Sequence, residues 1–419
     1  MECEKIDFDI PFGVRKICKI LQENGEDGFL VGGSVRDLLL GVPPGDFDLA
    51  STATPEKMMS LFRRVIPTGI DHGTVTVVIK KNTFEVTTLR SEQGYTDGRH
   101  PDSVKYVTDI VEDLSRRDFT VNAIAWNPLT KELFDPFGGR GDLSARILRA
   151  VGDAHVRFEE DGLRIMRAAR FAATLEFELE ASTLNAISGA AYRLENVSVE
   201  RKRVELQKLL LAVRPSCGLR VMAEHNIFKY ICRDGVGADT PQSWQTLYQR
   251  VDAVPASFHL RLAALFLRVP PVHLNAWLEH FLIDKRTKKR VLSLCVLFPV
   301  PFQPEWSDAE VRRFLSCVGK EHYGDFLSLF VAQEEADNGN RIAARQFDER
   351  VKSIDGLGSP LTISELAVSG KDLISVFGLS PGRQIGVMLE RLLQRVLETP
   401  AENSKERLVA IAKTFLSDS

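Results

Sequence analysis

Segments that read as β-strands occur only in the first third of this chain, and that boundary limits its fold more than any other feature. They are rich in β-branched residues and comprise Phe29–Gly33, Asp46–Ala50, Gly73–Lys80 and Phe84–Leu89. A helix is expected over 34–40 with Ser34 as its N-cap. Another is expected after Ala50, because Thr54 can cap it and Pro55 can take its first position. Interleaved strands and helices predict an α+β domain with a mixed sheet.

Beyond about residue 150 the pattern becomes helical. Apolar residues recur there at spacings of three and four, most clearly over Leu163–Ala173, Val199–Val213, Leu260–Leu267, Val291–Phe298 and Val387–Leu397. Breaks near 214–218, 235–241 and 353–360 separate these segments. The sequence therefore predicts an all-helical remainder made of two or three bundles.

The charge of the chain is balanced, with 54 Lys and Arg against 57 Asp and Glu and a formal net charge of −3. This excludes a protein that coats nucleic acid by bulk basic charge, but it leaves room for a local basic groove. No apolar stretch is long enough for a membrane helix, and the N-terminus lacks a secretory pattern. The six cysteines form no CxxC pair, which favours reduced thiols in a cytoplasmic protein.

Two aspartates in GDFDLA, Asp46 and Asp48, are candidate metal ligands. On a strand they would point to one face, where paired carboxylates suit Mg²⁺ ions and phosphoryl transfer. Glu85, on a neighbouring predicted strand, is the candidate third carboxylate. Acid pairs are common in a chain with this many acids, so a solvated surface strand is the alternative for the doublet alone.

A glycine pair, Gly32 and Gly33, opens the segment GGSVRD ahead of the doublet. Paired glycines let the backbone approach a ligand, and Arg36 adds a guanidinium group that is able to bind phosphate through two hydrogen bonds. No GKS or GKT follows, so the segment is not a P-loop, and a tight structural turn is the alternative. A phosphate cradle close to a metal dyad is more specific than either element alone.

The segment RRDFTVNA begins with Arg116, Arg117 and Asp118. Its arginines are able to neutralise a triphosphate, and Asp118 is able to accept hydrogen bonds from ribose hydroxyls. The alternative is a helix C-terminus, where cations match the helix dipole and an aspartate serves as a cap.

The segment EDGLRIMRAARF carries a charged residue at every third position. On a helix these residues would form one stripe, while apolar residues such as Phe171 pack elsewhere. A salt-bridged face is the alternative, but the arginines outnumber the acids, which favours an anionic ligand. The stripe consists of Asp161, Arg164, Arg167 and Arg170.

Asp161 and Arg164 have complementary hydrogen-bonding capacity, because a carboxylate only accepts and a guanidinium only donates. The pairing edges of adenine and cytosine each show an amino donor beside a ring-nitrogen acceptor, whereas uracil and guanine reverse that order. One such pair is thus able to accept A and C and to reject U and G. With about 1–3 kcal/mol for each mismatched group, discrimination reaches roughly 30-fold or more.

These motifs together resemble those of the bacterial (class II) tRNA nucleotidyltransferases, the CCA-adding enzymes, within the polymerase-β-like superfamily. The likeness is dense over 28–215, returns at SGKDLISVFGLSPGRQIG and is loose over 216–360. Its pieces are LVGGSVRDLLLG, GDFDLA, RRDFTVNA, FDPFGG, EDGLRIMRAARF and VERKRVELQKLL.

The resemblance implies a sheet-based nucleotidyltransferase head at 1–148, then a helical neck at 149–215, body at 216–352 and tail at 353–419. It implies that Asp46 and Asp48 bind Mg²⁺, that Gly32, Gly33, Arg36, Arg117 and Asp118 contact the nucleotide, and that Asp161 and Arg164 select its base with help from Arg167 and Arg170. Glu200, Arg201 and Glu205 would brace the neck. The implied partners are CTP, ATP and tRNA, with no membrane and no obligate protein partner.

Two relatives of these enzymes are the alternatives. Bacterial poly(A) polymerases carry a GRRFRLAHV-like stretch where this chain has IPTGIDHGTVTVV, which argues against them. The loop RSEQGYTDGRHPDSVKY argues against CC-addition alone, although His100 stands where arginine is usual, and A-adding enzymes keep that loop too. Candidate tRNA contacts are Arg201, Lys202, Arg203, Lys208 and the run KRTKKR at 285–290, for which a solvated loop or helix end is the alternative.

Overall fold

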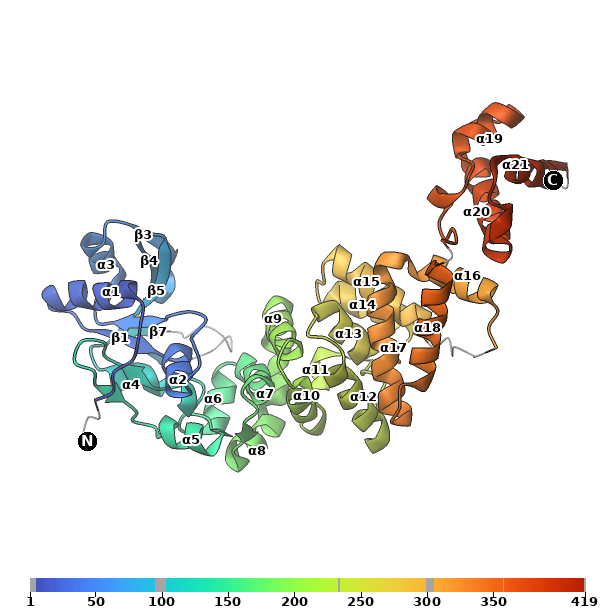
Figure 1. The fold of residues 1–419 in the computed structure, drawn as a ribbon. Helices are drawn as coiled ribbons and strands as arrows, with labels where there is room; N and C mark the ends of the chain where they lie inside the picture. The colour runs from blue at the N-terminus through green and yellow to red at the C-terminus, as the bar shows by residue number, and fades with distance from the viewer. Residues whose placement is uncertain (1–4, 95–102, 233, 299–304, 357, 418–419) are drawn as a thin grey trace. The chain divides into compact units, whose positions relative to one another are not determined.

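The computed structural model describes residues 5–94, 103–232, 234–298, 305–356 and 358–417. The chain divides into two compact units, Met1–Arg233 and Asp234–Ser419. In Figure 1 the first unit runs from blue to green and the second from yellow to red. In the part of the chain that is described, no helix is long and apolar enough to cross a membrane.

A seven-stranded sheet forms the centre of the N-terminal part, in the order β3-β4-β5-β2-β1-β8-β9. Its strands β2 and β5 are parallel, whereas the other neighbours pair antiparallel. The predicted α+β class with a mixed sheet is therefore confirmed. The strands are β1 (Gly28–Val31), β2 (Leu49–Ser51), β3 (Val65–Gly69), β4 (Thr74–Ile79), β5 (Asn82–Thr88), β8 (Ala125–Trp126) and β9 (Leu133–Phe134).

Helices cover the sheet on both faces, so β1 is buried along its whole length. Phe29 and Val31 join a cluster with Leu114 of helix α4 (Ile110–Ser115). The alternate residue Gly28 lies against helix α1 (Phe12–Glu23), where an added Cβ would stand 3.0 Å from Leu21. The remaining helices of this part are α2 (Gly33–Leu39), α3 (Pro55–Leu61) and α5 (Gly139–Ala145).

Two local predictions around Asp46 and Asp48 were wrong. The strand expected over Asp46–Ala50 begins only at Leu49, so both aspartates lie in the bend that precedes it. Ser34 is not an N-cap, because α2 already begins at Gly33 and Gly32 takes the cap position. The Ser34 hydroxyl instead accepts from the Asp48 amide at 2.9 Å and donates to the Asp46 carbonyl at 3.1 Å.

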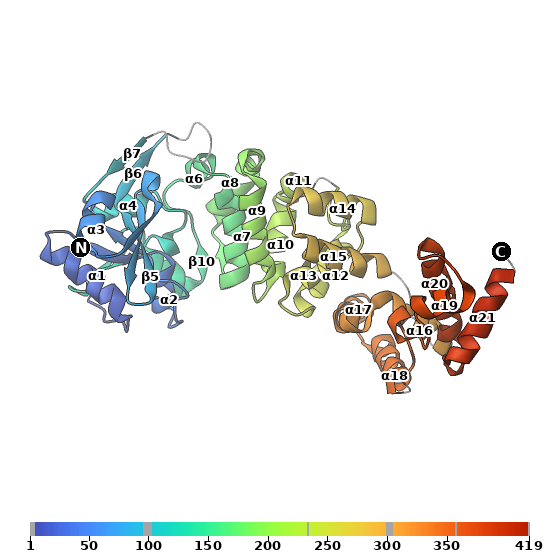
Figure 2. The same ribbon diagram turned by 90° about the horizontal axis from the view of Figure 1, so that it is seen from above.

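A helical region completes the first unit. Helix α7 (Leu163–Leu175) packs against both α9 (Val199–Leu210) and α10 (Pro215–Glu224), and the three helices lie side by side in Figure 2. Close packing requires Gly218, since a Cβ there would lie 2.3 Å from the Ala169 carbonyl oxygen. Further helices are α6 (Ala154–Glu160), α8 (Ala181–Ala190) and α11 (Phe228–Ile231), and the short strands β10 (Ile147–Leu148) and β11 (Glu178–Leu179) pair beside α7.

A hairpin of β6 (Arg90–Gln93) and β7 (Ser103–Tyr106) flanks the loop expected to support A addition. The centre of that loop, with His100, lies outside the described residues. Each of the five cysteines that the structure describes is a free thiol, as expected for reduced cysteines.

The second unit is a helical assembly joined by buried links. Arg250 donates to the Ala264 carbonyl and to the Gln333 side chain, both at 2.7 Å. Arg312 donates at 2.7 Å to the carbonyl of Leu397. The helices are α12 (Pro241–Ala253), α13 (Phe258–Phe266), α14 (Pro271–His280), α15 (Lys285–Leu297), α16 (Asp308–Val318), α17 (Tyr323–Asn338), α18 (Ile342–Gly356), α19 (Gly370–Phe377), α20 (Arg383–Glu398) and α21 (Lys405–Ser417).

Candidate active site

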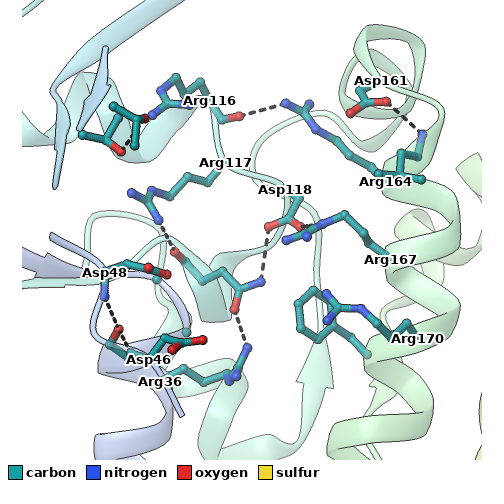
Figure 3. Close-up of a pocket in the computed structure, with 18 of the residues that line it drawn as sticks. Arg36, Asp46, Asp48, Arg116, Arg117, Asp118, Asp161, Arg164, Arg167 and Arg170 are labelled. Carbon is teal, nitrogen blue, oxygen red and sulfur yellow. Dashed lines mark hydrogen bonds and ion pairs between the residues drawn. The ribbon is translucent and has the colours of Figure 1, made fainter. Parts of the chain in front are cut away.

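A cavity of about 800 Å³ in the first unit brings the predicted site residues together. Figure 3 shows Asp46 and Asp48 on one side and the arginines of α7 on the other. Glu85 is the predicted site residue absent from the lining. The predicted residues that line the cavity are Gly32, Gly33, Arg36, Asp46, Asp48, Arg117, Asp118, Asp161, Arg164, Arg167 and Arg170.

The acidic end of the cavity is fixed by the Ser34 hydroxyl, which holds the bend that carries both aspartates. Glu85 lies on β5, the strand beside β2, two positions from Thr87 of the lining. Partial burial and the Glu85 and Asp46 carboxylates raise the pKa of Asp48, although Arg117 opposes them. Glu85 therefore acts on the doublet electrostatically from outside the lining.

The two aspartates fit a divalent cation on chemical grounds, because a nearby positive ion offsets the burial and the carboxylate repulsion that together raise the pKa of Asp48. Among the described residues, no group of three or more His, Cys, Asp or Glu side chains is preassembled as a metal site. A divalent cation is able to take one or two protein carboxylates and to complete its shell with water and substrate phosphates.

The glycine turn brings backbone close to the cations of the cavity. Gly32 has a φ of 69°, and an added Cβ would stand 2.8 Å from Nη1 of Arg117. A side chain there would be strained and would also displace that arginine. From the last turn of α2, Arg36 reaches Asp37 at 2.9 Å through its Nε.

Asp113 holds both arginines of the RRD segment and was missed by the sequence analysis. The carboxylate is fully buried and binds Arg116 at 2.6 Å and Arg117 at 3.2 Å. Burial alone would raise the pKa of Asp113, but the two guanidinium groups lower it below its usual value. The only sequence signal is an acid three and four residues before an arginine pair.

Asn122 joins three of the predicted site residues, although its position in the sequence predicted no role for it. Its side-chain oxygen accepts from Arg36 at 2.8 Å, and its amide group donates to Asp118 at 3.2 Å. Its carbonyl accepts from Arg117 at 3.5 Å, while Asp118 in turn binds Arg167 at 2.6 Å. Asn122 is 5% exposed, so these bonds link α2 to α7 away from solvent.

The arginines of α7 are individually tethered. Arg164 pairs with Glu160 and donates to the Arg116 carbonyl at 3.0 Å. Arg170 forms an ion pair with Glu205 at 2.7 Å. Burial and the neighbouring Arg167 lower the pKa of Arg170 to about 10.

Asp161 and Arg164 both line the cavity, and different partners hold their side chains, although the Arg164 amide donates to the Asp161 carbonyl at 3.0 Å. Asp161 precedes α7, accepts from Arg201 at 2.7 Å and accepts from the Leu163 amide at 3.0 Å. Because separate partners hold them, the acceptor and the donor are placed independently beside the same space.

Phe171 lines the cavity, so the prediction that it packs elsewhere was wrong. The guanidinium carbons of Arg170, Arg167 and Arg36 stand 4.0, 5.3 and 5.5 Å from its ring centroid. Cation–π contacts of this kind favour clustering of cations around one ring. The periodicity of α7 did not reveal this, because the partner Arg36 comes from a distant helix.

Three family descriptions match successive parts of the chain. Residues 28–149 match the "Poly A polymerase head domain", 176–235 the "Probable RNA and SrmB- binding site of polymerase A" and 259–412 the "tRNA nucleotidyltransferase domain 2 putative". Together with the fold and the cavity, they define a nucleotidyltransferase of the poly(A) polymerase and tRNA nucleotidyltransferase class. Enzymes of this class generally use divalent metal ions.

Relatives that match nearly the whole chain identify the family within this class. The chain is 35% identical to the CCA-adding enzyme of Streptococcus thermophilus over 97% of this chain and 98% of the relative. It is 32% identical to the Bacillus stearothermophilus CCA-adding enzyme solved in complex with CTP, with a TM-score of 0.77 over 98% of this chain and 99% of that chain. The Thermotoga maritima CCA-adding enzyme complexed with tRNA has the same fold at 21% identity, with a TM-score of 0.69 over 99% of this chain and 97% of that chain. The chain belongs to the family of CCA-adding enzymes.

Proposed function

We propose that this protein adds C and A from CTP and ATP to the 3′ end of tRNA without a nucleic-acid template, and that it works in the cytoplasm. The observation that carries the proposal is the shared cavity, which sets the acidic doublet opposite the Asp161–Arg164 end of α7. Both halves of the reaction, phosphoryl transfer and base selection, then act on one nucleotide. The names of the full-length relatives support the same activity.

The acidic end of the cavity, together with Arg36 and Arg117, would carry out phosphoryl transfer. Asp46 and Asp48, with Glu85 close by, would hold Mg²⁺, which when bound activates a hydroxyl nucleophile and neutralises phosphate charge. The tRNA 3′-hydroxyl attacks the α-phosphorus in line, and pyrophosphate leaves. Arg36 and Arg117 are fixed by Asn122 on the same side, where they suit the triphosphate.

Base selection falls to Asp161 and Arg164. A carboxylate has room for about four hydrogen bonds, so Asp161 is able to accept from a base amino group while it remains bound to Arg201. Arg164 donates to the ring nitrogen beside that amino group. Asp118 is engaged by Arg167 and Asn122, so its role here is to orient Arg167 as well as to meet the ribose.

The helical parts at 149–215, 216–352 and 353–419 are proposed as neck, body and tail, the last two for tRNA binding. Among the candidate RNA contacts, Lys202 is buried and donates to the Leu194 carbonyl at 3.2 Å, so it does not face an RNA. Arg201 serves Asp161 instead. The run at 285–290 forms the first turns of α15.

Product length tests the proposal directly. The purified protein is offered tRNA that ends at the discriminator base, after C or after CC, with CTP, ATP or both. Completion of CCA from every substrate supports the proposal. Extension of the CC-ending tRNA alone would indicate an A-adding enzyme, and a long A tail would indicate a poly(A) polymerase; either result contradicts it.

A further inference from the structure

A single buried carboxylate, that of Asp113 on α4, contacts three of the arginines that line the nucleotide cavity. Asp113 is completely buried and lies behind the lining, so it is not placed to meet a nucleotide. It binds the guanidinium groups of Arg116 and Arg117 and accepts from the Arg90 amide at 3.3 Å. One anion therefore holds a wall of the cavity that carries three cations.

The two oxygens of Asp113 serve different parts of the site. Oδ2 accepts from Arg117 at 3.2 Å, and Arg117 lies close enough to Asp48 to oppose the rise in the pKa of that carboxyl. Oδ1 accepts from Nη2 of Arg116 at 2.6 Å and from its Nε at 3.0 Å. The backbone carbonyl of Arg116 in turn accepts from Arg164 at 3.0 Å, as Figure 3 shows. Asp113 thus joins the arginine beside the acidic end to the arginine proposed to read the base.

Arg116 occupies the C-cap of α4, where a backbone carbonyl has no partner within the helix. That carbonyl is therefore available to Arg164, and its position depends on what holds the Arg116 side chain. Asp113 holds it from one side, and the Arg90 carbonyl accepts from the same Nε at 3.0 Å. Charged hydrogen bonds to a buried carboxylate are costly to break, so this connection is stiff before a nucleotide binds.

We propose that Asp113 is a positioning residue that couples triphosphate binding to base selection, an inference that rests on the proposed function. Its oxygens set Arg117 for the phosphates and, through Arg116, set Arg164 for the base. Without the carboxylate, the guanidinium groups of Arg116 and Arg117 lose their shared acceptor and repel each other, because a guanidinium only donates. A displacement of about 1 Å at such groups is enough to cost about 100-fold in rate.

Asp113→Ala removes both oxygens and tests the coupling. We expect kcat/KM for CTP and ATP to fall by about 100-fold and the preference for CTP over UTP to fall by about tenfold. Because Asp113 acts on the base through Arg164, Asp113→Ala should cause no further loss of preference in a protein that already carries Arg164→Ala. Two additive losses would overturn the coupling.

Glu334→Ala is the matched control for the loss of a buried carboxylate. Glu334 is also buried, but it lies in the second unit and accepts from the Ala343 and Ala344 amides, both at 2.8 Å. This change should lower the stability of the protein and leave the preference for CTP over UTP as it is. A preference that falls as far in Glu334→Ala as in Asp113→Ala would overturn the specific role of Asp113.

Arg116→Lys keeps the inference testable if Asp113→Ala fails to fold. The side chain is partly exposed and the positive charge remains, but lysine lacks the planar group that meets Asp113 and the Arg90 carbonyl together. We expect the preference for CTP over UTP to fall by at least about threefold, while KM for CTP changes by less than that factor. Circular dichroism and urea unfolding establish which variants are folded.

The measurements are kcat/KM for the four nucleotides and the affinities for CTP and UTP by calorimetry, on the full chain. An unchanged preference in the folded variants, or a loss of kcat/KM that is equal for all four nucleotides, would leave Asp113 with a structural role only and overturn the inference. Nucleotide addition by the unmodified protein is scored separately. Its absence refutes the proposed function, whereas a selective unmodified protein with equally selective variants refutes only this inference.

Discussion

At the residue scale, Asn122 shows what a linear motif does not reveal. Its amide bridges Arg36 and Asp118, which are 86 and 4 positions away along the chain. The charged residues around Asn122 were recognised in the sequence as candidate phosphate and base contacts because of their residue types. The bridge depends on tertiary placement, and an asparagine in a loop has many other uses, so the sequence offered no specific signal for it.

Replacing Asn122 by Ala should lower kcat/KM for nucleotide addition by about 100-fold, because Arg36 and Asp118 lose their common partner and shift within the cavity. Asn127→Ala is the matched control, since Asn127 is also buried and accepts from the Leu129 and Thr130 amides outside the cavity. Each change should cost about 1–3 kcal/mol of stability. The measurements are kcat/KM for nucleotide addition and the free energy of unfolding in urea. If both variants lose activity in proportion to their loss of stability, Asn122 has only a structural role.

Arg164→Ala should relax base selection. Without the guanidinium donor, discrimination of CTP and ATP over UTP and GTP should fall by about 10- to 100-fold, as about 1–3 kcal/mol per lost hydrogen bond implies. Arg157→Ala removes another guanidinium from Glu160, which it contacts at 2.5 Å, without touching the cavity lining. The ratio of kcat/KM values for the four nucleotides is the measurement. An Arg164→Ala protein that stays fully selective would contradict the base-reading role.

Asp48→Asn should abolish nucleotide addition without loss of stability. The pKa of Asp48 is raised in the folded protein, so its ionisation opposes folding, and this penalty develops as pH rises from the ordinary aspartate value through the raised pKa. At neutral pH the variant should melt at the same or a higher temperature than the unmodified protein. Mg²⁺ should raise Tm of the unmodified protein more than that of the variant. Asp9→Asn, an exposed change outside the cavity, is the control; a Tm loss specific to Asp48→Asn would refute the electrostatic account.

At the scale of elements, the sequence pattern predicted helices and strands correctly where local signals determine them. It failed where hydrogen bonds or contacts between distant segments change the local structure. The helix with Thr54 as cap and Pro55 at its start is present as α3, since both signals are local. The strand expected at Asp46 starts three residues late, because the Ser34 hydroxyl holds that backbone in a bend instead of leaving it to a neighbouring strand. The face of α7 assigned to packing includes Phe171, which three arginines surround.

The packing of α7 against α10 should depend on Gly218. A Cβ at this position would stand 2.3 Å from the Ala169 carbonyl oxygen and 2.8 Å from Leu209, so Gly218→Ala should cost about 1–3 kcal/mol through forced separation of the helices. Gly141→Ala, in α5 of the same unit, meets nothing within 4 Å and should be neutral or stabilising by up to about 1 kcal/mol. Urea unfolding of both variants checks this contrast. Equal stability of the two variants would contradict the close approach.

At the scale of the whole molecule, a net charge of −3 is compatible with an RNA substrate because charge is distributed unevenly. The first unit concentrates arginines around one cavity, and the second presents cations along α15. Sequence reasoning anticipated the sheet followed by helices, since a change of periodicity marks it. The four-part division remains a prediction, and the two compact units meet at 233 and 234, next to the break in the helical pattern near 235–241.

Because every residue that lines the nucleotide cavity belongs to Met1–Arg233, a chain that ends at Arg233 should bind CTP about as tightly as the full chain. Its tRNA affinity should fall by at least tenfold, since the truncation removes the helical part that we propose to bind tRNA, including the cations of α15. Calorimetry with CTP and filter binding with tRNA measure the two effects, and circular dichroism confirms folding. Arg117→Ala should reduce CTP binding equally in both chain lengths. A folded short chain that keeps full tRNA affinity would show that the first unit alone holds the RNA.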